Sequence, residues 1–255
     1  MKVRKYVISL FLILTFAAPA YCATKDTARL LILEGNARYS EEKFEEAIAE
    51  YEKVLSMGYE SGPFYYNLGN AYFKHGELGR AILNYLRAAR LMPQEADLKA
   101  NLNYARSLVK NGRVTLGRNW YARLFFALAD SFSLDSITFV FMILYFTLAL
   151  LVILAITKTG PGKVYLYVNS ALFAVLIISV SLFAIKYKKE ILEKEAVCVV
   201  ERSDSKFEPS IGGTTFFTLN EGEPITVTAS KKDWVKIRRQ DGKQGWIKRT
   251  DIDLL

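Results

Sequence analysis

The chain of 255 residues contains one histidine and two cysteines, and this scarcity excludes several kinds of site. His75 has no close group of His, Cys and carboxylate residues around it, so the sequence predicts no metal site. Cys22 lies at the end of a segment patterned like an export signal, and its removal would leave Cys198 without a disulfide partner. Neither a nucleophile with a base and an orienting group nor a phosphate-binding loop is evident. We therefore expect no enzymatic activity and no cofactor.

Charged side chains are absent from two stretches, 136–157 and 164–185. As a helix, each would span roughly 33 Å at about 1.5 Å per residue, which matches a bilayer core of about 30 Å. We assign transmembrane helices to 137–157 and 164–186, and the short Gly-Pro-Gly link predicts an antiparallel hairpin. A transport path or proton relay would need charges within the spans, so we interpret the hairpin as an anchor.

The N-terminus is typical of a secretory signal, which we assign to residues 1–22. Lys2, Arg4 and Lys5 precede an apolar run over 6–16, and small residues follow it. A lipoprotein signal, with cleavage before Cys22, is the competing interpretation, although Tyr21 stands where such a signal needs a small residue. An uncleaved anchor would give the same topology for the rest of the chain.

The net charge of +8 is concentrated around the apolar stretches, since residues 110–194 hold ten basic and four acidic side chains. Membrane headgroups are therefore a better partner than nucleic acid. The basic flanks of the hairpin would lie in the cytoplasm by the positive-inside rule, whereas an export signal would place them outside. We favour the signal, because the first apolar segment usually sets orientation. The prediction is a two-pass inner-membrane protein whose flanking domains face the periplasm or cell exterior.

A repeat with a period of 34 residues lies between the signal and the hairpin. Such a period, with small residues at fixed positions, predicts helical-hairpin repeats with Gly69 facing Ala81. The recurring positions are Gly35 and Gly69, Asn36 and Asn70, Ala37 and Ala71, Ala47 and Ala81, Ile48 and Ile82, and Tyr51 and Tyr85.

Residues 28–93 resemble two tetratricopeptide repeats (28–60 and 61–93), and 94–109 the capping helix that follows them, with Leu98 and Leu102 on its apolar face. The resemblance implies a concave surface that binds a protein or peptide. Tyr39 and Phe73 could equally be packing residues, and the basic residues of a carboxylate-binding groove are missing. The residues that the resemblance assigns to the concave surface are Asn36, Tyr39, Asn67, Asn70, Phe73 and Lys74.

Residues 119–134 mix aromatic residues with one Arg and one Asp. This composition suits a helix in the membrane interface, although an ordinary amphipathic packing helix fits equally well. Ser133 or Asp135 would cap the helix that follows.

The C-terminal residues 195–255 change to a two-residue period, which predicts short strands over 196–200, 224–230, 234–239 and 245–249. Asp241-Gly242 predicts a tight hairpin between the last two. With the Leu-x-Glu-Gly turn at 219–222, this segment resembles a bacterial SH3-type barrel. Trp234 and Trp246 could contact a partner or peptidoglycan, and we favour a core position for Trp246. We also expect Cys198 to be buried.

The order of signal, repeats, hairpin and barrel is similar to the family of BatE-type proteins of the bacterial Bat aerotolerance operon. The expected fold is multidomain: all-α tetratricopeptide repeats, an α-helical transmembrane hairpin and an all-β SH3-like barrel. The resemblance implies an envelope complex with von Willebrand A-type Bat proteins and a MoxR-type ATPase. The first hypothesis is a non-enzymatic membrane-anchored adaptor, and the alternative is a tether that binds peptidoglycan through the barrel.

Overall fold

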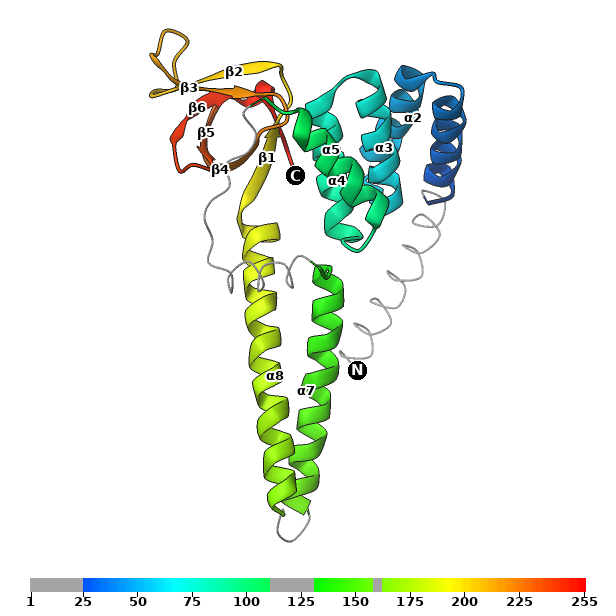
Figure 1. Ribbon diagram of the computed structural model, residues 1–255, viewed down its shortest axis with the longest axis vertical. Coiled ribbons are helices and arrows are strands. Elements are labelled where there is room, and N and C mark those ends of the chain that lie inside the picture. Colours follow the sequence, from blue (N-terminus) through cyan, green and yellow to red (C-terminus); the bar gives the residue numbers. More distant parts are fainter. Residues whose placement is uncertain (1–24, 111–130, 158–161) are drawn as a thin grey trace, which may run out of the picture.

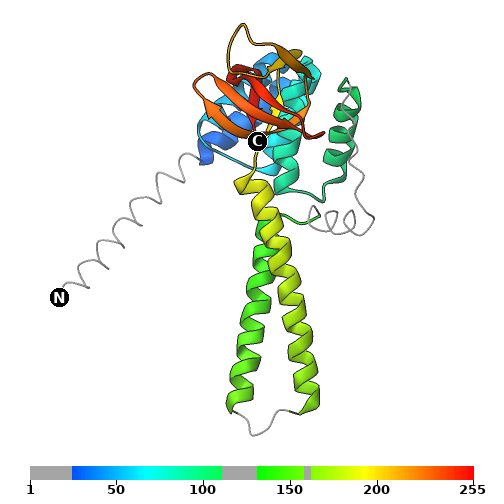
Figure 2. The same ribbon diagram turned by 90° about the vertical axis from the view of Figure 1, so that its left-hand side faces the viewer.

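The computed structural model describes residues 25–110, 131–157 and 162–255 in three parts. A helical array and a β-domain lie together at one end of a long helical hairpin, as both views show (Figures 1 and 2). The predicted fold class is confirmed: an all-α repeat region, two long apolar helices and an all-β domain. The predicted signal at 1–22 and the interfacial segment up to residue 130 lie outside the described residues.

The helical array consists of antiparallel helix pairs that follow the predicted repeat. Ser61 caps one helix by accepting a hydrogen bond from the Phe64 backbone N–H at 3.3 Å. Gly76 ends the same helix in the left-handed conformation at a φ of 95°, which only glycine adopts without strain. The helices are 25–40, α2 (Phe44–Ser56), α3 (Gly62–His75), α4 (Leu78–Leu91) and α5 (Ala96–Leu108).

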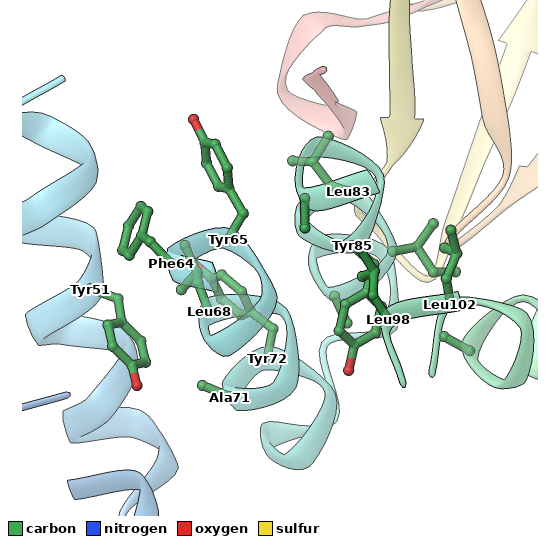
Figure 3. Close-up of a cluster of buried hydrophobic side chains, with 14 of the residues drawn as sticks. Tyr51, Phe64, Tyr65, Leu68, Ala71, Tyr72, Leu83, Tyr85, Leu98 and Leu102 are labelled. Atoms are coloured by element: carbon green, nitrogen blue, oxygen red, sulfur yellow. The ribbon is translucent and has the colours of Figure 1, made fainter. Parts of the chain in front are cut away.

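Two buried tyrosines explain the two repeated glycines. The ring of Tyr51 lies against Gly35, and the ring of Tyr85 lies against Gly69. Both rings are fully buried in the core (Figure 3). A methyl group on either glycine would lie within 2.8 Å of ring carbons. Gly69 also approaches the Ala81 carbonyl, as predicted, with 3.3 Å between that oxygen and such a methyl. The absence of a side chain at these glycines therefore lets a tyrosine ring pack closely and, at Gly69, lets the backbone of the next helix approach.

The hairpin consists of α7 (Leu134–Thr157) and α8 (Lys163–Tyr187), which run antiparallel. Ser133 rather than Asp135 caps α7, since its Oγ accepts a hydrogen bond from the Ser136 N–H at 3.2 Å. Most of the described side chains on both helices point outward. Both helices are long and apolar enough to cross a membrane. A π-helical turn (Lys188–Leu192) connects α8 to the β-domain.

The β-domain is one antiparallel sheet with the strand order β3-β2-β6-β5-β4-β1-β7. The predicted hairpin at Asp241-Gly242 joins β5 to β6, with Gly242 at a φ of 88°. A 3-10 turn (Arg249–Asp251) precedes the last strand. The strands are β1 (Lys194–Cys198), β2 (Arg202–Lys206), β3 (Thr215–Asn220), β4 (Pro224–Lys231), β5 (Trp234–Arg239), β6 (Gln244–Lys248) and β7 (Ile252–Leu254).

The core of the β-domain is mainly aliphatic, with Phe217 and Cys198 among its buried residues, and the favoured core position for Trp246 is wrong. In β6, Gly245 and Ile247 are buried, and Trp246 between them is half-exposed on the other face. The two-residue period of a strand decides this placement, because alternate side chains point to opposite faces. Cys198, by contrast, is completely buried, as predicted.

Candidate functional site

An asparagine–tyrosine ladder runs along the helical array and repeats with the sequence period. Asn36 Oδ1 accepts hydrogen bonds from the Tyr51 hydroxyl at 2.6 Å and from Asn67 Nδ2 at 3.0 Å. One repeat later, Asn70 Oδ1 accepts from the Tyr85 hydroxyl at 2.8 Å and from Asn101 Nδ2 at 3.1 Å. Each step of the ladder therefore joins three helices through one amide oxygen.

Burial extends the pH range over which the tyrosines of this ladder are neutral. It raises the pKa of Tyr51 to about 12 and raises the pKa of Tyr85 as well. Both hydroxyls therefore remain donors at neutral pH, and both asparagine oxygens are occupied. Within the part of the chain that the structure describes, the Nδ2 groups of Asn36 and Asn70 form no hydrogen bond, so they can donate to a ligand.

A cavity of about 280 Å³ opens beside the second step of this ladder. Phe73 and Tyr104 form an aromatic pair on its wall, with ring centroids 5.8 Å apart. Lys74 is the cation of the lining, which otherwise consists of amides and aromatic rings. The lining suits an extended peptide, which offers backbone carbonyls to amide donors and side chains to aromatic surfaces. It consists of Tyr39, Asn70, Phe73, Lys74, Tyr85, Asn101 and Tyr104.

The structure places four of the six residues assigned to the concave surface on this cavity: Tyr39, Asn70, Phe73 and Lys74. Asn36 and Asn67 lie one repeat away, paired in the first step of the ladder. Sequence reasoning did not select Tyr104. Its signal was the helical period of α5, in which Leu98, Leu102 and Ala105 are buried and Tyr104 is exposed.

The outer face of the β-domain forms a second candidate surface, here called the tryptophan face: Trp234, Trp246, Lys206 and Lys236. Lys206 Nζ lies 5.8 Å from the centre of the Trp234 ring, within the range of a cation–π contact. Trp246 pairs with Lys236 across one strand boundary and with Lys206 across the other. Both tryptophans are partly exposed. The face offers aromatic surface beside positive charge.

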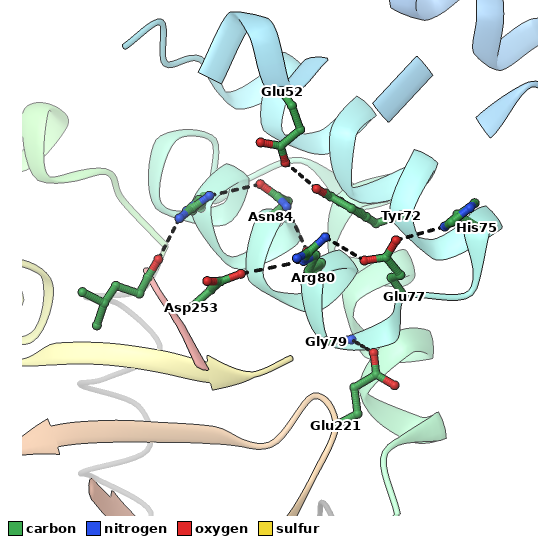
Figure 4. Close-up of polar contacts among 11 residues, drawn as sticks. Glu52, Tyr72, His75, Glu77, Gly79, Arg80, Asn84, Glu221 and Asp253 are labelled. Atoms are coloured by element: carbon green, nitrogen blue, oxygen red, sulfur yellow. Dashed lines mark hydrogen bonds and ion pairs between the residues drawn. The ribbon is translucent and has the colours of Figure 1, made fainter. Parts of the chain in front are cut away.

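The two candidate surfaces belong to modules that pack directly against each other through α4. The backbone of α4 approaches β1 so closely that a methyl on Gly79 would lie 2.5 Å from the Cys198 carbonyl oxygen. Glu221, from the turn between β3 and β4, accepts a hydrogen bond from the Gly79 N–H at 2.7 Å (Figure 4). A carboxylate at a helix N-terminus is favoured by the helix dipole. Val197 of β1 even belongs to the core of the helical array.

Three arginines of α4 extend this junction. Arg90 forms an ion pair with Glu195 at 2.9 Å, and Arg87 donates to the Leu254 carbonyl at 2.7 Å. Arg80 lies 3.9 Å from Asp253 and also pairs with Glu77 (Figure 4). His75 is exposed and contacts Glu77 at 3.0 Å. Because they share contacts and core residues, the two modules lie on the same side of any membrane that the hairpin crosses.

Paired helices with a repeated Gly–Tyr packing unit, joined to a small antiparallel sheet, are an arrangement typical of interaction modules. Residues 32–97 match the tetratricopeptide repeat family, and residues 207–253 match the bacterial SH3 domain family. No curated protein matches the chain. Domains of both families are typically non-catalytic and mediate binding. The first supports interaction with proteins, and the second supports a role in the cell envelope.

Proposed function

We propose that the chain is a membrane-anchored adaptor whose helical array binds an extended segment of a partner protein. The observation that carries this proposal is the cavity beside Asn70, where an unoccupied amide donor faces an aromatic wall. A small array offers limited contact area, so binding through it alone would be weak. Fixing the array to a membrane raises its effective concentration toward membrane-bound partners.

The proposed compartment is the periplasm or cell exterior, with the hairpin in the inner membrane and a signal at 1–22. The proposed partners follow from the similarity in domain order to BatE-type proteins: von Willebrand A-type membrane proteins and a MoxR-type ATPase system. Such a complex would link the chain to aerotolerance or stress. The adaptor itself would be non-enzymatic, and its part would be to hold partners together.

The test is capture of a von Willebrand A-type Bat protein by the full chain in detergent or nanodiscs. We expect Asn70→Ala combined with Phe73→Ala to lower recovery several-fold, because the pair removes the amide donor and half of the aromatic wall. Asn103→Ala is the matched control, since Asn103 is exposed on α5 outside the cavity lining. Equal recovery by the double variant and the control would exclude this cavity as the binding site.

The tryptophan face favours a second candidate function, a tether that binds peptidoglycan. Half-exposed indole rings provide flat surfaces for sugar rings, and the neighbouring Lys206 and Lys236 suit the carboxylates of wall peptides. Sedimentation of the full chain with purified cell wall tests this function. Trp234→Ala with Trp246→Ala should abolish co-sedimentation, and Lys231→Ala should retain it. Failure of the unaltered chain to sediment would exclude the tether.

A further inference from the structure

The outward positions of β5 and β6 carry positive charge and no negative charge. Neither strand contains an acidic residue. Lys236 and Arg238 of β5 and Lys248 of β6 occupy the same alternating positions as the two tryptophans, so they lie on the same face of the sheet. Lys206 joins this face from β2, the neighbouring strand. Four cations are therefore gathered on and beside the tryptophan face.

Cations and indole rings alternate across this face. Trp234 lies opposite Lys248, and Trp246 lies between Lys236 on one neighbouring strand and Lys206 on the other. Residues directly opposite each other in antiparallel strands have their side chains on one face and within reach of each other. Lys206 Nζ also lies 5.8 Å from the centre of the Trp234 ring. Each indole ring therefore has lysine side chains beside it.

Carboxylates do not neutralise the cations of this face. Within the described residues, the three outward cations of β5 and β6 form no ion pair. The acidic residues of the two adjoining turns are Asp233 and Asp241, and Asp241 is held by Arg239 at 2.5 Å. A surface of one sign attracts ligands of the opposite sign. The charge on this face therefore favours an anionic ligand.

The face is accessible, because β5 and β6 lie away from the helical array. The strand order places them in the middle of the sheet, whereas β1 and β7 contact α4. Figure 1 shows both strands on the side of the β-domain away from the array, and Figure 2, which looks at that side, shows them in front. Arg238 and Lys248 are exposed, and Lys206 and Lys236 are partly exposed. A polymer can therefore lie across this face without meeting the array.

The spacing of the cations suits a repeating ligand. Their Cα atoms are about 7–10 Å apart, given the usual rise along a strand and the usual separation of neighbouring strands. Charges at this spacing with flat rings between them complement a chain in which anions and sugar rings alternate. A lysine binds a phosphate group as a point charge. The stem peptides of peptidoglycan carry ammonium as well as carboxylate groups, so a surface with charges of both signs would match them better.

We propose that the ligand of the tryptophan face is a phosphodiester-linked glycan of the cell wall, with its sugar rings on the two indoles and its phosphates at Lys206, Lys236 and Lys248. The proposal rests on the tether function, and it selects an anionic polymer attached to the wall over the peptidoglycan itself. In such a polymer the charge lies between successive rings, as it does on the face, and it persists at any physiological pH. A carboxylated glycan carries its charge on the ring instead.

The test compares two preparations of one cell wall in sedimentation with the full chain in phosphatidylcholine nanodiscs. One wall carries its phosphodiester-linked polymer, and the other has been treated with hydrofluoric acid, which cleaves phosphodiesters and leaves the peptidoglycan. We expect the chain to sediment with the untreated wall and to lose most of this binding with the treated wall. Added salt should weaken the binding, because ions screen exposed charges.

Lys236→Gln with Lys248→Gln should lower recovery on the untreated wall several-fold, while both tryptophans stay in place. Both lysines lie on the outward face, so the variant should still fold, and circular dichroism checks this. Lys43→Gln with Lys53→Gln, at the two ends of α2, is the matched control. It removes the same charge from the helical array and should leave recovery unchanged.

Equal sedimentation with both walls would overturn the proposal and leave the tether function, with peptidoglycan as its ligand. Sedimentation with neither wall would exclude the tether function as well. The proposal would also be overturned if the two lysine variants lowered recovery equally. The same holds if a single-stranded oligonucleotide of equal charge displaced the chain from the wall as well as the free polymer does, since the face would then bind any polyanion.

Discussion

At the scale of single residues, glycines mark the closest approaches in this molecule. Gly35 and Gly69 were recognisable from the sequence because the repeat places both at one register. Gly79 has no counterpart in the first repeat, where Glu45 stands at the corresponding position. A glycine at a position where the other repeat has a glutamate indicates a close contact with a segment outside the array. The sequence could not identify β1 as the partner, because the contact joins residues more than one hundred positions apart.

Gly69→Ala should destabilise the array by about 1–3 kcal/mol, the usual cost of inserting a methyl into a packed core. The new methyl would lie 2.7 Å from a ring carbon of Tyr85, which is buried and hydrogen-bonded and cannot move away freely. Gly212→Ala is the control, because a methyl there meets nothing within 4 Å. Thermal unfolding followed by circular dichroism measures both, and equal midpoints for the two variants would contradict the packing described here.

Cys198 should be unreactive in the folded chain. Burial raises the pKa of its thiol to about 12, and nearby Asp251, Glu223 and Glu221 act in the same direction. At pH 8 the thiolate fraction falls about a thousandfold relative to a free cysteine. In a Cys22→Ser background, a thiol reagent at pH 8 should modify Cys198 only after denaturation, while an added Ser107→Cys should react at once. Rapid modification of Cys198 in the native protein would show that β1 opens.

At the scale of helices and strands, the period of the sequence was informative wherever one face is apolar. The repeat helices, the two spans and four strands follow from it, as does the apolar face of α5. Strand β2 was missed because its inward positions are Ser203 and Ser205 instead of apolar residues. Ser203 donates to Asp251 at 2.7 Å, and Ser205 lies against Gly245. Serines at the two inward positions leave no two-residue apolar pattern in the sequence.

The same reasoning explains the candidate site. The resemblance to tetratricopeptide repeats assigned Tyr39, Asn70, Phe73 and Lys74 to one surface, and all four line the same cavity. It did not indicate that Tyr104 of the capping helix would complete the aromatic wall, since that helix lies outside the repeat. The sequence also could not place the tryptophan face relative to the cavity, because that placement depends on how the two modules dock.

The helical array should lose stability in alkaline solution before pH 12. Burial raises the pKa of Tyr51 and Tyr65 to about 12 and raises that of Tyr72 and Tyr85. An unfolded tyrosine titrates near pH 10. A pKa raised on folding gives stability that is complete below pH 10 and is lost as the pH rises toward the folded value.

Circular dichroism with tyrosinate absorbance at 295 nm measures this loss. We expect the helical signal to fall between pH 10 and 12, with part of the tyrosine absorbance change coinciding with it. Tyr51→Phe should be less stable at neutral pH, since Asn36 loses a donor, and should show a shallower alkaline decline. Ionisation of every tyrosine near pH 10 with the helical signal intact would contradict the burial described here.

At the scale of the whole molecule, the docked modules form one body on the hairpin. The turn that carries the SH3-type Leu-x-Glu-Gly sequence makes two contacts with the array. Glu221 accepts a hydrogen bond at the N-terminus of α4. Gly222 has no side chain, which leaves room for Ile82 and Val109 to pack against it. Asn220 of the same turn donates to the Lys110 carbonyl at 3.1 Å. A turn shared in this way sets a fixed angle between the concave cavity and the tryptophan face. An adaptor built so would present two partners in one orientation.

Gly79→Ala should loosen this docking while leaving each module folded. The methyl would meet the backbone carbonyl of Cys198, which lies within a sheet and has no alternative conformation to adopt. Glu221→Gln keeps the shape of the side chain but removes the charge at the α4 N-terminus, so its effect should be smaller and should decrease with added salt. Spin labels on Ser107→Cys and Ser230→Cys, both exposed, report the distance between the modules.

The labelled protein carries Cys22→Ser as background, and its Cys198 is buried and is not labelled. When its docking surface is unaltered, electron–electron double resonance should give one narrow distribution of the distance between the two spin labels. Gly79→Ala should broaden it markedly, Glu221→Gln should broaden it less, and Gly212→Ala should leave it narrow. A narrow distribution in all variants would mean that the remaining contacts, chiefly Arg90 with Glu195 and Arg87 with the Leu254 carbonyl, hold the modules without the helix cap. A broad distribution in the background protein would instead show that the two surfaces move independently, and the fixed angle between partners would be lost.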